Sequence, residues 1–255
     1  MDLLQGFADV SPLQLILVAI VGFAASFLGG VSGYGNSALL PLVLIPITGP
    51  EPLVPIISIV GVCNNLTRII AFRRYIDFSR SWIVLAFSLP ACVLGAYTYT
   101  KLTAPIILIL IGTMLTLSVP LRRILRKRNI ELEKRGLAGG SVIFGFLTGT
   151  TPGAGVILMS LLMAAGMTGA AVIATDAIIS AITGVTRMGV YWASGLMTAQ
   201  VIAFGLLIGF AALPGAFAAR WFVERLPVHM HTAILDGIVI LGGATMIVQA
   251  IRQFL

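Results

Sequence analysis

The stretch GGVSGYGNS at residues 29–37 interrupts a long apolar run near the start of the chain. A second stretch, TGTTPGAG at residues 148–155, interrupts an apolar run in the second half. Glycine and proline weaken a helix, and three longer apolar segments follow each break. The two breaks therefore divide the chain into two halves with the same plan.

The composition indicates that these segments fold in a lipid bilayer and not in water. Hydrophobic residues make up 58% of the 255 residues and charged residues only 10%, far from the values of a soluble domain. A bilayer core of about 30 Å needs about 20 apolar residues per crossing helix. We therefore expect an all-α polytopic membrane protein whose residues 1–255 form a single membrane domain. The apolar runs lie at about 13–28, 37–47, 52–72, 81–99, 104–121, 137–149, 154–166, 169–192, 198–220 and 231–250.

The halves align as repeats over about 13–121 and 137–250. Thr67-Arg68 matches Thr186-Arg187, and Leu89-Pro90 matches Leu213-Pro214, in the same order and at nearly constant separation. Residues 13–47 would measure about 52 Å as one helix, which suits two crossings or a re-entrant pair. Either option returns the chain to its starting side, so each half crosses an odd number of times. The sequence thus predicts an inverted repeat.

Basic residues indicate orientation. The net charge is +7, and the Lys and Arg residues gather in the loop that contains Arg73, Arg74 and Arg80 and in the linker 122–135. Short basic loops stay on the cytoplasmic side, which places both termini outside in a multi-pass protein of the plasma or inner cell membrane. No sequence is left for a basic soluble module, so nucleic acid is not an expected partner.

Two other features concern the N-terminus and the cysteines. MDLLQGFADVSP has no Lys or Arg, so it lacks the basic region of a secretory signal peptide. Cys63 and Cys92 lie within apolar segments, where free thiols are expected. No metal or cofactor is expected.

The matched breaks mark the expected binding site, because interrupted helices at corresponding positions of inverted repeats point to a transporter's substrate site. Thr151-Pro152 is typical of a helix N-cap followed by proline, and Asn36-Ser37 could cap the equivalent helix. Two helix N-termini would then favour an anion. Packing of small residues is the alternative role for glycines, which we accept for Gly22 and Gly95. The expected substrate-binding residues are Ser32, Gly33, Tyr34, Gly35, Asn36, Ser37, Asn64, Asn65, Arg68, Thr150, Thr151, Gly153, Gly155, Thr183 and Arg187.

Charged residues inside the apolar segments are functional hypotheses by default. Arg68 and Arg187 could hold an anion or extend to the membrane interface. Asp176 could carry a proton, pair with an arginine or cap a helix. For Asp236, near the start of the last segment, we expect structural pairing.

Two rival functions follow from the same sequence. Gly30-Val31-Ser32-Gly33 fits the motif of an intramembrane serine protease, with His229 or His231 as the base. A passive anion channel is the second rival, although an internal inverted repeat favours alternating access. Zinc-protease spacing and a P-loop are both missing from the sequence.

Taken together, the pattern resembles the sulfite exporter TauE/SafE family of membrane permeases. The shared features are the early Gly-rich break in each half, the third segment ending in a basic loop, and the stretch from Leu213-Pro214-Gly215 to Glu224-Arg225-Leu226-Pro227. The resemblance implies a secondary transporter, not an enzyme, that exports small oxyanions such as sulfite or organosulfonates, with or without proton coupling. Its partners would be the anion and the lipid bilayer. A homodimer is left open. Thr175-Asp176 and the Thr- and Pro-rich second break depart from the family pattern.

Overall fold

The structure is a computed structural model that describes residues 3–8, 10–32, 35–127, 133–223 and 240–252. Within these ranges, side chains are not described at 3–4, 28–32, 35–38, 122–123, 125–127, 134 and 216–223. The elements are η1 (Leu3–Phe7), α1 (Pro12–Ser32), α2 (Gly35–Thr48), α3 (Leu53–Phe72), η2 (Arg73–Tyr75), α4 (Phe78–Tyr99), α5 (Ala104–Lys127), α6 (Lys134–Thr150), α7 (Gly155–Ala164), α8 (Gly169–Ala193) and α9 (Ala199–Val223). A further helix covers Ile240–Arg252.

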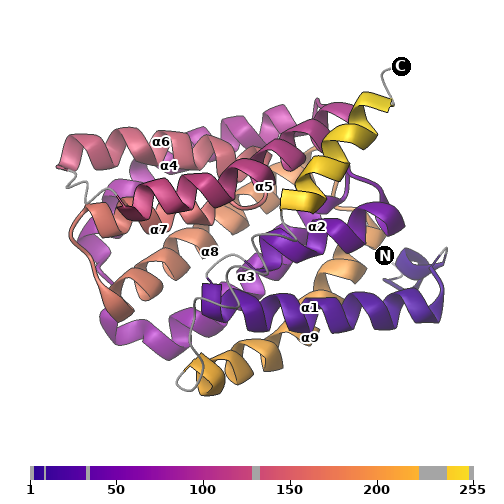
Figure 1. Cartoon of the computed structure of the whole chain (residues 1–255), viewed down its shortest axis with the longest axis horizontal. Helices are drawn as coiled ribbons and strands as arrows, with labels where there is room; N and C mark the ends of the chain where they lie inside the picture. The colour runs from indigo at the N-terminus through magenta and orange to yellow at the C-terminus, as the bar shows by residue number, and fades with distance from the viewer. Residues whose placement is uncertain (1–2, 9, 33–34, 128–132, 224–239, 253–255) are drawn as a thin grey trace.

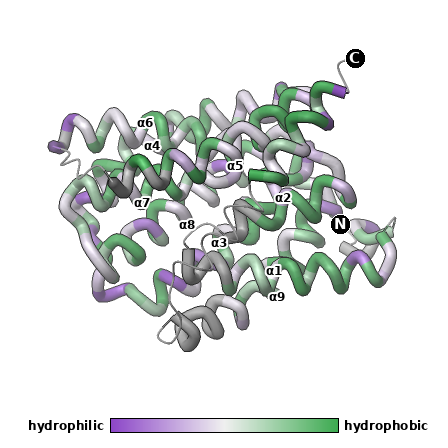
Figure 2. Tube along the Cα trace, in the orientation of Figure 1, coloured by the Kyte–Doolittle hydropathy of each residue, from purple (hydrophilic) through white to green (hydrophobic). Residues whose placement is uncertain are grey.

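The described elements are helical, as the sequence predicts. Among the described residues, four spans are long and apolar enough to cross a membrane: Leu53–Tyr75, Phe78–Tyr99, Ala104–Leu121 and Gly169–Ala193. Shorter apolar helices accompany them, and Figure 2 shows long hydrophobic stretches in α1, α5 and α7. Helices satisfy their own backbone N–H and C=O groups, which is the condition for crossing lipid. The structure therefore confirms a helical protein with several membrane-spanning segments.

Two helices, one from each half, form the centre of the bundle. α3 and α8 pack on each other, α4 packs on α6 and α8, and α1 packs on α9, which also contacts α3. In Figure 1, α4 and α6 lie on one side of the α3–α8 pair and α1 and α9 on the other. The packing of α1 on α9 thus resembles the packing of α6 on α4, since each pairs the first long helix of one half with a helix of the other half.

The directions of the central helices follow from their contacts. A Cβ atom added to Gly61 of α3 would lie 3.8 Å from a terminal nitrogen of Arg187 on α8. Further along α3, Arg68 bonds to Asp176, which precedes Arg187 on α8. Contacts nearer the C-terminus of α3 are thus nearer the N-terminus of α8, so the two helices are antiparallel.

Close backbone approach joins α4 to α6 and α9 to α1. A Cβ atom at Gly95 would overlap the carbonyl oxygen of Phe146, and one at Gly22 would lie 2.8 Å from a methyl carbon of Ile208. Small residues allow such contacts between membrane helices, where there is no hydrophobic drive between apolar surfaces. The packing role expected for Gly22 and Gly95 is confirmed.

The basic linker is shorter than the sequence indicates. α5 continues to Lys127 and α6 begins at Lys134, so most of the stretch 122–135 is helical. Long basic side chains favour the helical conformation and also suit a helix C-terminus. The helix therefore runs on past its apolar part.

α6 and α7 form a hairpin whose two ends lie together. Leu161 of α7 contacts Gly140 near the start of α6. Ala165, just after α7, lines the same cavity as Leu137 and Asp77. α7 has 10 residues, a length of about 15 Å that is half of a bilayer core. Its N-terminus therefore begins inside the bundle.

Candidate functional site

The break in the second half is a helix end whose carbonyl groups are satisfied by nearby side chains. α6 ends at Thr150. The hydroxyl of Thr150 donates to the carbonyl oxygens of Phe146 and Leu147, each at 3.2 Å, and the hydroxyl of Thr151 donates to Leu147 at 3.0 Å. The carbonyl oxygen of Leu147 also accepts from the backbone N–H of Thr151 at 2.8 Å, so these hydroxyls are additional donors at the end of α6.

The expectation that Thr151-Pro152 caps the following helix is wrong. Thr151 is the C-cap of α6, whereas the N-cap of α7 is Ala154, which makes no side-chain capping bond. The hydroxyl of Thr151 goes to the preceding helix because the carbonyl of Leu147 lies within reach, in a segment where lipid offers no donor.

Arg187 is the buried cation at this break. Its side chain leaves α8 and donates from Nη1 to the carbonyl oxygen of Thr148 at 2.7 Å, near the end of α6. The residue is only 9% exposed, and its Nε is buried without a hydrogen-bond partner. Within the described parts of the chain, no carboxylate forms an ion pair with it. A buried charge without a counterion costs several kcal/mol, so this environment favours an anion.

The free edge of Arg187 suits a small oxyanion. Nη1 donates to Thr148, and no described residue accepts from the edge formed by Nε and Nη2. Two parallel N–H groups of a guanidinium bind two oxygens of one anion. The contact with Gly61 shows that this part of Arg187 is directed toward α3.

The start of α7 adds backbone donors to the same break. Gly153 has φ +96°, a left-handed conformation that favours glycine. Over the described ranges, the N–H groups of Gly153, Ala154 and Gly155 donate no hydrogen bond. A Cβ atom on Gly155 would meet nothing within 4 Å. The helix N-terminus therefore faces open space with free donors, which is an anion-favouring environment.

The polar residues of α3 meet α8 at a second place. Arg68 Nη1 lies 2.9 Å from Oδ2 of Asp176 and 3.1 Å from the amide oxygen of Asn65. Asp176 is buried at 4% exposure, and its Oδ1 has no partner among the described residues. Of the options left open by the sequence, pairing of Asp176 with an arginine is confirmed, and the arginine is Arg68.

Asn64 and Thr183 lie between these two arginines. Asn64 is buried, and its amide oxygen lies 3.5 Å from the hydroxyl of Ser26 on α1. Thr183 is also buried, and its hydroxyl bonds to the carbonyl of Ile179 within α8. Ser26 and Tyr191, whose hydroxyl donates to the carbonyl oxygen of Gly149, were not predicted from the sequence because no motif singles them out.

The first break is covered only in part. Gly33 and Tyr34 lie outside the described residues, and the side chains of Ser32, Asn36 and Ser37 are not described. α2 begins at Gly35, which places Asn36 and Ser37 in its first turn. The capping role of Asn36-Ser37 and the protease hypothesis, which needs Ser32 with His229 or His231, therefore lie outside what the structure describes, as does Asp236.

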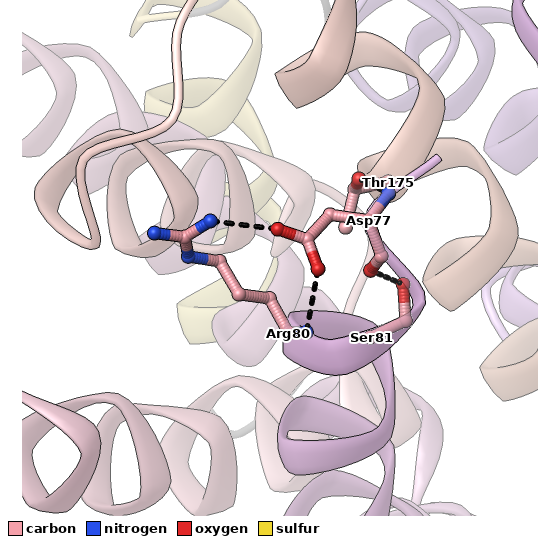
Figure 3. A network of polar contacts seen from close by, with 4 residues as sticks. All are labelled: Asp77, Arg80, Ser81 and Thr175. Carbon is pink, nitrogen blue, oxygen red and sulfur yellow. Dashed lines mark hydrogen bonds and ion pairs between the residues drawn. The ribbon is translucent and has the colours of Figure 1, made fainter. Parts of the chain in front are cut away.

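An open cavity of about 840 Å³ lies at the end of the bundle that carries the α3–α4 loop. Figure 3 shows its polar wall: Asp77 caps α4 by accepting from the backbone N–H of Arg80 at 2.9 Å, and its own backbone N–H donates to Thr175 of α8 at 3.0 Å. The Arg80 N–H is the main reason that the pKa of Asp77 is lowered. The lining residues are Asp77, Ser79, Arg80, Ile83, Glu133, Arg135, Leu137 and Ala165.

The cysteines and metal-binding groups add no further chemistry. Cys63 and Cys92 are free thiols, as expected, and Cys92 lies 3.6 Å from the carbonyl oxygen of Thr183. Groups of His, Cys, Asp and Glu that could hold a metal ion do not occur in the part of the chain that the structure describes.

These features define a polytopic helical membrane protein of the transporter class, with interrupted helices and a buried arginine inside the bundle. The family model for the sulfite exporter TauE/SafE matches residues 18–246, so the chain belongs to this family. Its members are membrane transporters of sulfite and other small anions. Searches among curated proteins and solved structures found no match.

Proposed function

We propose that the protein is a secondary transporter that exports small oxyanions such as sulfite or organosulfonates by alternating access. The observation that carries this proposal is Arg187, a buried arginine with a free Nε and no described counterion. A pyramidal or tetrahedral oxyanion would accept from the free edge of Arg187 and from the N–H groups at the start of α7. Ser32 to Ser37, from the first break, and Thr150 and Thr151 would complete the site.

Alternating access in this proposal rests on an inverted repeat. The repeat would relate α1 to α6, α3 to α8 and α4 to α9. Antiparallel packing of α3 against α8 supports inversion, because equivalent helices in a parallel repeat would run in the same direction. α5 and the helix Ile240–Arg252 also run antiparallel. Gly112 lies against Gly243 and Ile247, whereas Thr116, further along α5, lies against Gly243.

Orientation and location follow from charge. The α3–α4 loop and the start of α6 lie at one end of the bundle, and the start of α1 and the end of Ile240–Arg252 lie at the other (Figure 1). We place the first end on the cytoplasmic side of the cell membrane, since it carries the basic loops. The cavity at that end would then receive the anion from the cytoplasm. Asp176 would supply proton coupling. A homodimer remains compatible with these features.

The test uses sulfite counterflow in proteoliposomes that contain the purified protein. We expect saturable counterflow, which a simple pore does not give, and at least a tenfold loss with Arg187→Gln because a charge-assisted hydrogen bond to a buried anion is lost. Arg252→Gln, at an exposed arginine of the last helix, is the matched control. Equal counterflow by the wild type and Arg187→Gln would refute the proposed role of Arg187.

A further inference from the structure

A polar strip joins the buried Arg187 to the partly exposed Arg68. Asp176, Thr183 and Arg187 share one face of α8, since seven and eleven residues correspond to about two and three helical turns. Arg68 lies on the face of α3 that meets α8, and Asn64 lies one helical turn before it. The strip runs for about 16 Å from Arg187 to the Arg68–Asp176 pair at 1.5 Å per residue.

The two arginines are equivalent in the repeat but differ in their partners. Thr67-Arg68 matches Thr186-Arg187, and the same separation of 119 residues (187 − 68) relates Asp176 to Ile57. Arg68 therefore has a carboxylate from the other half, whereas an apolar side chain occupies the corresponding position on α3 opposite Arg187. Among the described residues, a carboxylate thus pairs with Arg68 and none pairs with Arg187.

The ion pair between Arg68 and Asp176 leaves hydrogen-bonding atoms of both side chains without a described partner. One oxygen of Asp176 meets one guanidinium nitrogen of Arg68 at 2.9 Å, and the other oxygen is buried without a described partner. A bidentate pair would engage both oxygens and would hold more strongly. A free oxyanion that accepted two hydrogen bonds from Arg68 could therefore compete with this carboxylate.

We infer that Arg68 is a second subsite for the transported oxyanion and that the carboxylate of Asp176 occupies this subsite when no anion is there. The inference rests on the proposed function and adds a route for the anion through the bundle. The anion moves between Arg187 and Arg68 along the polar strip, and it displaces Asp176 when it reaches Arg68. Thr175, next to Asp176, bonds to the backbone of Asp77 in the wall of the open cavity (Figure 3). Arg68 is thus the subsite nearer to that cavity.

The experiment separates the two subsites by removing Arg187 first. Sulfite binding to the purified protein is measured by titration calorimetry in Tris chloride, which carries no sulfonate group. Arg187→Gln should weaken binding at least tenfold. Adding Asp176→Asn to Arg187→Gln should restore binding by about tenfold or more, because Arg68 is then free to form charge-assisted hydrogen bonds with the anion. A further Arg68→Gln should remove the restored binding.

Asp77→Asn in the Arg187→Gln protein is the matched control, since Asp77 is a carboxylate at the same end of the bundle but pairs with the partly exposed Arg80. It should restore nothing. Asp176→Ser replaces Asp176→Asn if the latter is not monodisperse, and a rise in melting temperature with sulfite gives a second readout.

Folded Arg187→Gln/Asp176→Asn protein that binds sulfite no better than Arg187→Gln would overturn the second subsite and leave the role of Arg187 intact. Wild-type and Arg187→Gln proteins that bind sulfite equally would instead refute the proposed function at Arg187.

Discussion

The hydroxyl of Tyr191 on α8 donates a hydrogen bond of 2.7 Å to the carbonyl oxygen of Gly149 at the end of α6. Tyr191 lies one helical turn after Arg187, which bonds to the neighbouring carbonyl of Thr148. Two side chains of α8 thus hold two consecutive carbonyl groups of the break. The position of the break relative to the central helices is fixed by these bonds.

Tyr191→Phe should destabilise this junction. The substitution keeps the ring but leaves the Gly149 carbonyl in a buried place without its donor, which costs about 1 to 3 kcal/mol. Thermal unfolding in detergent should show a lower melting temperature. Tyr97→Phe, at an exposed tyrosine, should leave the melting temperature nearly unchanged. Equal effects of the two variants would mean that the Tyr191 bond contributes no stability.

Gly153→Val should abolish sulfite binding. Gly153 has φ +96°, which a β-branched residue adopts only with strain of about 1 to 3 kcal/mol, and the added side chain would displace the N–H groups at the start of α7. Titration calorimetry measures the loss. Gly189→Val is the control, because a Cβ atom there meets open space on the exposed side of α8. Unchanged binding by folded Gly153→Val protein would place the anion elsewhere.

Asp176→Asn should abolish the pH dependence of transport while anion binding at Arg187 stays intact. An amide keeps the shape and hydrogen-bonding capacity of the carboxyl group but cannot titrate. Sulfite counterflow measured over a range of pH gives the profile for each protein. A variant with the wild-type profile would reduce Asp176 to a structural partner of Arg68.

Asp77→Ala should lower stability in a pH-dependent way. The folded-state pKa of Asp77 is lowered, first by the backbone N–H of Arg80. Its contribution is therefore complete above the unfolded pKa of about 3.9 and is lost as pH falls through the lower folded value. Loss of the N-cap should cost about 1 kcal/mol at pH 7, and the difference from wild type should shrink in acid. Asp77→Asn, which keeps a capping oxygen, is the control.

Cysteine labelling tests the inverted topology. Single cysteines at Asp2 and Gln253 should react with an impermeant reagent from outside the cell, and one at Asn129 should not, in a protein whose Cys63 and Cys92 are first replaced by alanine. The odd number of crossings per half is the reason for this pattern. If all three positions label from the same side, the inverted repeat is excluded.

Much of the helical layout could be predicted from the sequence. The segment predicted at 169–192 is α8 (Gly169–Ala193), and the one at 52–72 is α3 (Leu53–Phe72). Apolar runs of this length define membrane helices through local composition alone. The end of α5 was less predictable, because charged residues beyond the apolar part remain good helix formers.

The charged residues of the site could be predicted from the sequence, but their hydrogen-bond and ion-pair partners could not. The sequence selects Arg68, Asp176 and Arg187 because charged groups inside apolar segments are costly. Which arginine pairs with Asp176 depends on the antiparallel register of α3 and α8, which is a tertiary property. The hydroxyl of Thr151 was misassigned for a related reason: local sequence allows a cap on either side, and the nearby carbonyl of Leu147 decides.

Position 176 is a carboxylate, whereas the equivalent position in the first half is Ile57. This difference affects which side of the membrane the empty transporter faces. In an inverted repeat with identical halves, the inward-open and outward-open forms would be related by symmetry and would have equal free energies. The ion pair between Arg68 of one half and Asp176 of the other, with no carboxylate at Ile57 to form its counterpart, removes this equality. The resting protein would then populate one form in excess, by a factor of ten for each 1.4 kcal/mol or so. A single unmatched residue in a duplicated chain can thereby set which side of the membrane the empty carrier faces.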